Sequence, residues 1–314
     1  MRLEAYQHGI YPRSEQLVAA TRDLDRGRTD AATVDGEFGR DRDRFVAAQR
    51  EGGRDYLSDG MLRWQDVFRP FVEAAEGLSS GPLTRWFDTN SFFRAPVVTG
   101  PLSIDGTAVP FEDVGGAPRV VSLPSPFAFS RATQFDGDRD GLMLDLARDV
   151  LAPVAAEAVR AGAAIVHLED PWMAFYGIEP AAWGPLAKSI DELRSSFDAT
   201  VVLHTYFGDV APHAEQLQGL PVDAIGLDLF ASDAAAIELR GGIGVLLGCF
   251  DGRSSVVERA EELVPVISRL LDRLDPPACF LSSSGDLQLV SEVIARRKVA
   301  ALGELTAALR KEVS

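Results

Sequence analysis

Residues 163–209 have the sequence AAIVHLEDPWMAFYGIEPAAWGPLAKSIDELRSSFDATVVLHTYFGD. Two short apolar runs, 163–171 and 200–209, flank a stretch at 180–197 that is compatible with a helix. Both runs end in a cluster of polar residues. A strand, a helix and a second strand in this order are the repeating unit of parallel α/β folds.

The same unit recurs along the chain. Eight apolar runs end mostly in polar or charged clusters, with helix-compatible stretches between most of them: GIYP (9–12), YLSDG (56–60), RVVSLPSP (119–126), AAIVHLEDP (163–171), TVVLHTYFGD (200–209), AIGLDLF (224–230), GVLLGCFDGR (244–253) and ACFLSSSGD (278–286). Eight repeats predict a (β/α)8 TIM barrel, in which chemistry lies at the C-terminal ends of the strands. These ends are therefore where functional residues are expected.

A length of 314 residues suits one large barrel, and we expect a single domain over residues 1–314. One segment, around residues 79–118, breaks the alternation of strands and helices. Its alternating pattern is bounded by Gly and Pro, which predicts a hairpin inserted before the third barrel strand. Helices are expected at 14–27, 31–51, 140–162, 180–197, 211–218, 232–239, 255–274 and 287–311.

The composition excludes some classes of function. A net charge of −16 argues against non-specific binding of nucleic acid, whose phosphates need a basic surface. No apolar run approaches the roughly 20 residues of a membrane helix. The first residues lack the apolar core of a signal peptide, so we expect a cytoplasmic protein. Cys249 and Cys279 lie within apolar runs, where each is expected to act as a small buried hydrophobic residue.

Acidic residues and a histidine follow three neighbouring strands. Glu169 and Asp170 end one run; an acid there could hold a substrate ammonium group, act as a general base, or cap the next helix. His204 could be a metal ligand, a general acid or base, or a hydrogen-bonded residue of the barrel rim. Asp228 lies in a strongly apolar strand, which favours a paired or functional carboxylate. We predict that Glu169, His204 and Asp228 form the catalytic group.

Further strand ends carry candidate substrate contacts. Arg253 and Arg13 could each clamp a carboxylate, although a surface salt bridge explains either arginine equally well. Tyr206 adds a hydroxyl beside His204. Ser283 and Ser284 belong to a turn that could bind an anion or simply cap the last helix.

Taken together, several motifs resemble the cobalamin-independent methionine synthase family. They follow the order of the family over most of the chain: GIYPRSEQL (9–17), DGMLRWQDVFRPF (59–71), RWFDTNSFFRAP (85–96), HLEDP (167–171), LHTYFGDV (203–210), IGLDLF (225–230), LLGCFDGRSSVVE (246–258) and SSSGDL (282–287). The resemblance implies a TIM barrel. Full-length members look like two such barrels in tandem, and this chain is long enough for one.

The resemblance also bears on metal binding. The catalytic barrel of the family binds zinc through a His-x-Cys pair, a glutamate and a second cysteine. Here His204 matches the histidine, whereas Tyr206, Asp228 and Ser284 stand at the other three positions. Such an oxygen-rich set suits thiolate-supported zinc poorly, so no tight catalytic zinc is expected. The chain is more similar to the N-terminal barrel of the family, which lacks zinc ligands, and Glu169 aligns with the acid that contacts the amino group of homocysteine.

The resemblance implies a methyl (alkyl) transferase that acts on a thiol such as homocysteine, with a folate-like donor. The chain would work alone or as the non-zinc partner of a separate zinc-bearing barrel. Two alternatives stay open. One is a catalytically inactive binding or regulatory subunit, and the other is a metal-independent decarboxylase like those of the related porphyrin family.

Overall fold

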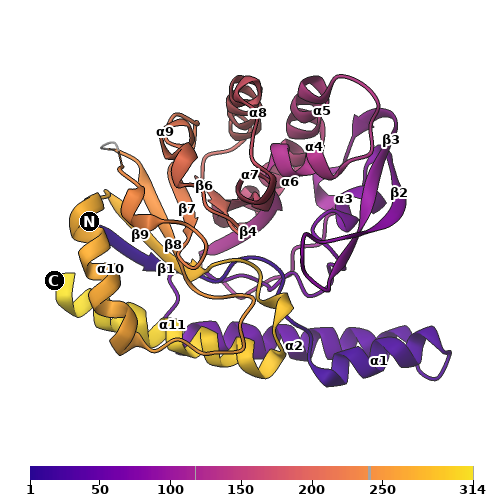
Figure 1. Cartoon of the computed structure of the whole chain (residues 1–314). Coiled ribbons are helices and arrows are strands. Elements are labelled where there is room, and N and C mark those ends of the chain that lie inside the picture. The colour runs from indigo at the N-terminus through magenta and orange to yellow at the C-terminus, as the bar shows by residue number, and fades with distance from the viewer. Residues whose placement is uncertain (117, 240–241, 314) are drawn as a thin grey trace.

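In a computed structural model, which describes residues 1–116, 118–239 and 242–313, seven parallel strands form one curved sheet. The strands are β1 (Arg2–Ala5), β4 (Arg119–Pro124), β5 (Ala163–Glu169), β6 (Thr200–Thr205), β7 (Ala224–Asp228), β8 (Gly244–Phe250) and β9 (Ala278–Ser283). Neighbours in the sheet follow the order β1-β9-β8-β7-β6-β5-β4, so β1 lies beside β9 rather than β4. This order curls the sheet toward a ring (Figure 1).

The gap between β1 and β4 is filled by residues 55–57. The amide of Asp55 donates to Ala5 O (3.1 Å), while Leu57 pairs with β4 in a single parallel bridge to Arg119. This segment therefore takes the eighth strand position, which confirms the predicted barrel. The predicted strand at 56–60 is reduced to that one bridge.

The predicted first strand, GIYP at 9–12, is wrong. β1 ends at Ala5, and residues 9–12 form a loop beyond its C-terminal end. Gly9 explains the difference, because its φ of +71° lies in the left-handed region and is incompatible with a strand. The loop turns across the mouth of the barrel instead of continuing the sheet.

Most of the predicted helices are present, on the outer side of the sheet (Figure 1). The α-helices are α1 (Glu15–Asp25), α2 (Ala31–Glu51), α3 (Arg69–Ala74), α4 (Pro126–Ala132), α5 (Arg139–Asp145), α6 (Ala152–Arg160), α7 (Pro171–Tyr176), α8 (Trp183–Arg194), α9 (Ala214–Leu217), α10 (Ala260–Leu274) and α11 (Glu292–Val313). The short helices α3, α4 and α7 were not predicted. In the described part of 232–239 there is a 3₁₀ turn, Ala234–Ala236, rather than the expected α-helix.

The helix predicted at 140–162 is continuous but changes its winding. A π-helical segment, Leu146–Leu151, joins α5 to α6. Pro153 is the second residue after this segment, and proline has no N–H to donate to the carbonyl four residues earlier. The extra residue in the turn accommodates that missing hydrogen bond.

The predicted insertion is an antiparallel hairpin of β2 (Glu76–Arg85) and β3 (Phe92–Ser103). It begins three residues earlier than expected. Its turn carries Trp86 and Phe87, whose rings lie 5.5 and 4.6 Å from the ring of Trp172 on α7. The hairpin is thereby anchored to the helix that follows β5.

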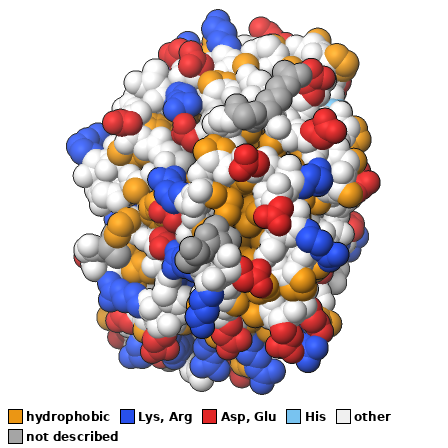
Figure 2. All heavy atoms as spheres, turned by 90° about the vertical axis from the view of Figure 1, so that its left-hand side faces the viewer, with side chains coloured by type: hydrophobic (Ala, Val, Ile, Leu, Met, Phe, Trp, Pro, Cys, Tyr) orange, Lys and Arg blue, Asp and Glu red, His pale blue; other side chains and the backbone are white. Residues whose placement is uncertain are grey.

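Cys249 and Cys279 are both fully buried in the main apolar core, unpaired with one another, as the sequence predicts. Most charged side chains are exposed or half-buried, although a few, among them Asp228 and Lys298, are buried. Figure 2 shows one face of the molecule on which acidic and basic side chains are interspersed. Among the described residues, no helix is both long enough and apolar enough to cross a membrane.

Candidate functional site

The interior of the barrel changes from apolar to polar along each strand. One layer is apolar and consists of Tyr6, Val120, Ile165, Val202, Ala224, Leu246 and Phe280. Side chains two positions apart on a strand share a face, so the next layer follows from the sequence. Its members are His8, Ser122, His167, His204, Gly226, Gly248 and Ser282. A barrel of this kind is usually filled with branched apolar side chains, and this second layer is not.

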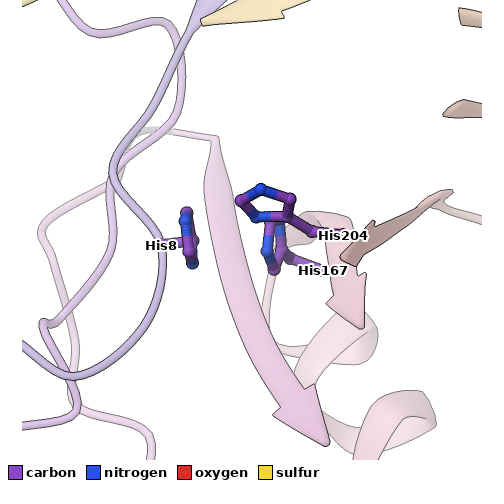
Figure 3. Close-up of side chains that lie close together, drawn as sticks. All are labelled: His8, His167 and His204. Atoms are coloured by element: carbon purple, nitrogen blue, oxygen red, sulfur yellow. The ribbon is translucent and has the colours of Figure 1, made fainter. Parts of the chain in front are cut away.

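Three imidazole rings fill much of the second layer (Figure 3). The ring of His8 stacks on that of His167 with centroids 4.2 Å apart, and His204 meets His8 edge-on at 4.8 Å. Gly226 leaves room for His204, because a Cβ at Gly226 would lie 2.6 Å from His204 Cδ2. The sequence therefore places a glycine where the ring needs space.

Some nitrogens of these rings have hydrogen-bond partners and others do not. His8 Nε2 donates to the carbonyl of Ser283 (3.1 Å), and His167 Nδ1 shares a hydrogen bond of 3.0 Å with the hydroxyl of Tyr6. His167 Nε2 and both ring nitrogens of His204 have no partner among the described residues. Burial lowers the pKa of His167 and of His204 well below the ordinary value, so both rings are neutral.

Two carboxylates lie next to His8. Glu169 Oε1 is 3.1 Å from His8 Nδ1, and Tyr206 donates a long hydrogen bond of 3.5 Å to Glu169 Oε2. Asp286 Oδ1 accepts from the amide of Ile10 (2.8 Å). Burial raises the pKa of Glu169 to about 8 and that of Asp286 to about 7. This end of the barrel is therefore a cluster of buried polar side chains.

Gly9 explains how the two carboxylates come so close to the loop after β1. A Cβ at this position would lie 1.8 Å from Asp286 Oδ1 and 2.9 Å from Glu169 Oε1. The left-handed φ of Gly9 and the lack of a side chain are thus both required here. The loop can then pack over the cluster of buried polar side chains.

The predicted catalytic group is only partly assembled. Glu169 and His204 both contact His8, so the structure brings these two together. Asp228 is instead held by backbone amides, with Phe230 N at 2.9 Å and Phe207 N at 3.2 Å. Burial raises its pKa to about 6. No described contact joins Asp228 to Glu169.

Asp170 points away from Glu169, as expected for adjacent residues of a strand. Its carboxylate accepts from Met173 N (3.0 Å) at the start of α7 and from the hydroxyl of Ser125. These contacts correspond to the capping alternative. Burial raises the pKa of Asp170 to about 7.

The two arginines predicted to contact a substrate already have partners within the protein. Arg13 donates to the carbonyls of Leu62 (2.8 Å) and Trp64 (3.1 Å), and it lines an open groove of about 1050 Å³ outside the barrel. Arg253 pairs with Asp88 at 2.8 Å, which corresponds to the salt-bridge alternative.

The two serines of the last strand turn also have partners. The hydroxyl of Ser283 accepts from Gln7 Nε2 (2.6 Å) and donates to Gly285 O (2.7 Å). The hydroxyl of Ser284 accepts from Gly252 N (3.2 Å). These contacts tie the turn to neighbouring loops.

His8, His167 and Asp286 were not predicted. His167 stands two residues before Glu169 on the same strand, so alternation alone would have placed both on one face. His8 directly precedes the run 9–12, which its apolar pattern predicts to be a strand, and Asp286 ends the SSSGD turn, in which only the serines are candidate contacts. The fold of the first loop, rather than a motif, brings them together.

The positions that correspond to the family's zinc ligands do not fit that ion. Tyr206 is directed to Glu169, Ser284 to a backbone amide, and Asp228 to two others. Neither cysteine substitutes for the missing thiolates. Burial raises the pKa of Cys249 to about 12 and that of Cys279 further, which disfavours the anionic form that binds metal.

Comparisons with known proteins agree with this fold. Residues 74–275 match the family model described as "Cobalamin-independent synthase, N-terminal domain". A methionine synthase from Sulfolobus acidocaldarius is 24% identical over 318 residues, covering 97% of this chain and 91% of that protein. The B12-independent methionine synthase from Shewanella sp. W3-18-1, solved in complex with selenomethionine, superimposes with a TM-score of 0.81 at 18% identity, over 100% of this chain and 99% of that one.

Other relatives are much longer. A 5-methyltetrahydropteroyltriglutamate–homocysteine methyltransferase from Herpetosiphon aurantiacus is 28% identical over 231 residues, which are 70% of this chain. The match spans only 30% of that enzyme. This chain thus corresponds to one part of such proteins.

Proposed function

Because this chain belongs to the cobalamin-independent methionine synthase family, we propose that it acts in methyl transfer to a thiol such as homocysteine. In this proposal the barrel is the non-zinc partner of a separate zinc-bearing barrel, and a methylated folate is the donor. A cytoplasmic location remains part of the proposal on the sequence grounds given above. The observation that carries it is the cluster of buried polar side chains around Glu169, at the end of β5, with no cysteine beside it among the described residues.

The cluster suits the ammonium group of an amino acid. Among the described residues, Glu169 Oε2 contacts only the hydroxyl of Tyr206, over a long distance. A carboxylate in such a site holds an ammonium group by charge-assisted hydrogen bonds. We therefore assign recognition of the substrate amino group to Glu169.

Activation of the thiol has to come from elsewhere. A thiol attacks as its thiolate, and a free thiol has a pKa of about 8.5. The lowered pKa of His204 makes this ring a weak base for that proton. The residues at the zinc-ligand positions are engaged with other groups, so a partner barrel is the source of metal-activated thiolate in this proposal.

The proposal is tested by binding and by transfer. The purified chain, alone and with a zinc-bearing barrel of the family, is titrated calorimetrically with homocysteine and with methyltetrahydrofolate, and methionine formation is measured. We expect binding to the partner barrel and transfer only in the mixture. The proposal is wrong if homocysteine, folate and the zinc barrel all fail to bind.

The role of Glu169 is tested by Glu169→Gln. Loss of one charge-assisted contact of about 1.5–3 kcal/mol should weaken homocysteine binding by roughly 10- to 150-fold. Glu304→Gln, on the exposed side of α11, is the matched control and should bind as the parent does. If both variants bind equally, Glu169 does not contact the substrate.

A further inference from the structure

Three side chains from separate segments lie close together in this buried cluster and could bind one metal ion. His8 lies after β1, Glu169 ends β5, and Asp286 follows β9. One potential ligand atom of each lies within 4.8 Å of those of the other two. Their exposed fractions are 1%, 2% and 2%, so water screens none of them.

The orientation of His8 favours a metal ligand. Because a carbonyl oxygen only accepts, the contact with Ser283 O requires that His8 Nε2 carry its hydrogen. Nδ1 then directs its lone pair at Glu169 Oε1, 3.1 Å away. Two lone-pair atoms at this distance need a proton or a cation between them. A ring nitrogen that donates to a backbone carbonyl is also the usual arrangement of metal-bound histidines.

The distances are compatible with a single ion. Two ligand atoms 3.1 Å apart subtend an angle of about 95° at an ion that is about 2.1 Å from each. At that bond length two ligands can be at most about 4.2 Å apart. The widest separation here is no more than 4.8 Å, so a small side-chain rotation brings all three within reach.

The ionised form of the cluster also suits a cation. Within the described parts of the chain, neither Glu169 nor Asp286 makes an ion pair with a lysine or arginine. Among the other buried acids, Asp41 pairs with Arg44, whereas Asp170 and Asp228 accept from backbone amides. Two adjacent buried carboxylates without a counter-charge are costly, and a divalent ion neutralises both.

The neighbouring histidines also indicate that a polar group binds here. His204 is fully buried, and neither of its ring nitrogens has a partner among the described residues; the same holds for His167 Nε2. Its ring centroid is 4.8 Å from that of His8. Buried polar atoms nearly always have a partner. A water molecule bound to the ion would supply one.

We propose that His8, Glu169 and Asp286 bind one divalent transition-metal ion. One imidazole nitrogen and two carboxylate oxygens suit Mn²⁺, Fe²⁺ or Zn²⁺ better than a thiophilic ion. None of the three residues stands at a zinc-ligand position of the family, so this site is a different one. It goes beyond the proposed function, because Glu169 binds the ion through Oε1 and keeps Oε2 for a substrate.

The first test uses the whole chain. Protein purified without chelator is analysed for metal by mass spectrometry, stripped with chelator, and titrated with Mn²⁺ or Zn²⁺ while the melting temperature is followed. We expect one equivalent of ion per chain and a melting temperature that rises with ion concentration. Failure of the stripped, folded protein to take up either ion stoichiometrically overturns the proposal.

Variants locate the site. His8→Gln, Glu169→Gln and Asp286→Asn should each weaken ion binding at least tenfold, whereas His213→Gln, on a 3₁₀ turn outside the barrel, should not. If binding depends on His167 and His204 but tolerates Glu169→Gln and Asp286→Asn, the ion lies among the imidazoles and the proposal is wrong.

Spectroscopy tests the wild-type chain without any variant. Co²⁺ bound to one nitrogen and several oxygens should give weak visible bands and no thiolate charge-transfer band, and such a band would overturn the assignment. These measurements need no homocysteine, folate or partner barrel. A failed transfer assay therefore leaves the metal site standing, and a failed titration leaves the transferase proposal standing.

Discussion

Lys298 offers the sharpest test of the packing between the barrel and its last helix. This lysine on α11 is only 1% exposed and donates to Glu258 Oε2 at 2.7 Å and to the carbonyl of Val256. Glu258 Oε1 in turn accepts from Asp251 N at 2.8 Å. The pair thus fixes the loop after β8, which also carries Arg253.

Replacing Lys298 with methionine keeps the aliphatic stem and removes the charge. The carboxylate of Glu258, with 11% exposure, then has no counter-ion. Breaking one partner of a buried pair costs about 3–5 kcal/mol, mainly through the charge left behind. Lys298→Met should lower the free energy of unfolding by that amount. Lys298→Met combined with Glu258→Gln removes the stranded charge and should recover at least about 2 kcal/mol.

Guanidinium unfolding of each variant measures these differences, provided that the slope of the transition is unchanged. Lys188→Met is the matched control, because Lys188 is exposed on α8, and its effect should stay within about 0.5 kcal/mol. The reasoning is refuted if Lys298→Met costs less than about 1 kcal/mol, or if the double variant is no more stable than the single one.

Three further changes have expected outcomes. Gly226→Ala forces a methyl group against His204 and should cost about 1–3 kcal/mol or more, seen as a lower melting temperature. Arg253→Gln breaks an ion pair with Asp88 that is well exposed at both ends, so urea unfolding should show a loss below about 1 kcal/mol. Burial raises the pKa of Asp66, so the folded state holds its proton longer than the unfolded state. The stability of the wild type relative to Asp66→Asn should therefore fall as pH rises above about 4, in unfolding curves recorded across pH.

Each of these has an outcome that contradicts it. Gly184→Ala, with nothing within 4 Å of the added carbon, should stabilise α8 by about 0.5–1 kcal/mol. A Gly226→Ala protein that matches Gly184→Ala would show that His204 does not occupy the space. A loss of several kcal/mol in Arg253→Gln, or a pH-independent difference for Asp66→Asn, would likewise contradict the reasoning.

The barrel was predictable because its strands are short apolar runs at regular spacing with helices between them. The run AAIVHLEDP begins where β5 begins and extends two residues beyond its end, and alternation along it fixes the inward face. The first strand could not be found this way. RLEA is four residues long and half charged, whereas GIYP looks apolar but contains a glycine in the left-handed conformation.

The site was harder to predict than the fold. Position at a strand end makes Glu169 and His204 candidates, and the structure places both beside His8. The position of Asp228 at a strand end does not show that its carboxylate accepts hydrogen bonds from backbone amides. Those contacts depend on the path of the loops after β6 and β7. His8 and Asp286 come from loops, whose contacts leave no periodic signal in the sequence.

The bridge at residues 55–57 has a consequence for how the chain acquires its shape. The amide of Asp55 donates to Ala5 O, and its carboxylate accepts from Ala5 N. The guanidinium of Arg310 on α11 also donates to this carboxylate. These hydrogen bonds therefore connect β1, residues 55–57 and α11. α11 must be synthesised before Arg310 can contact Asp55, so the nascent chain lacks this contact while the strands before α11 emerge from the ribosome.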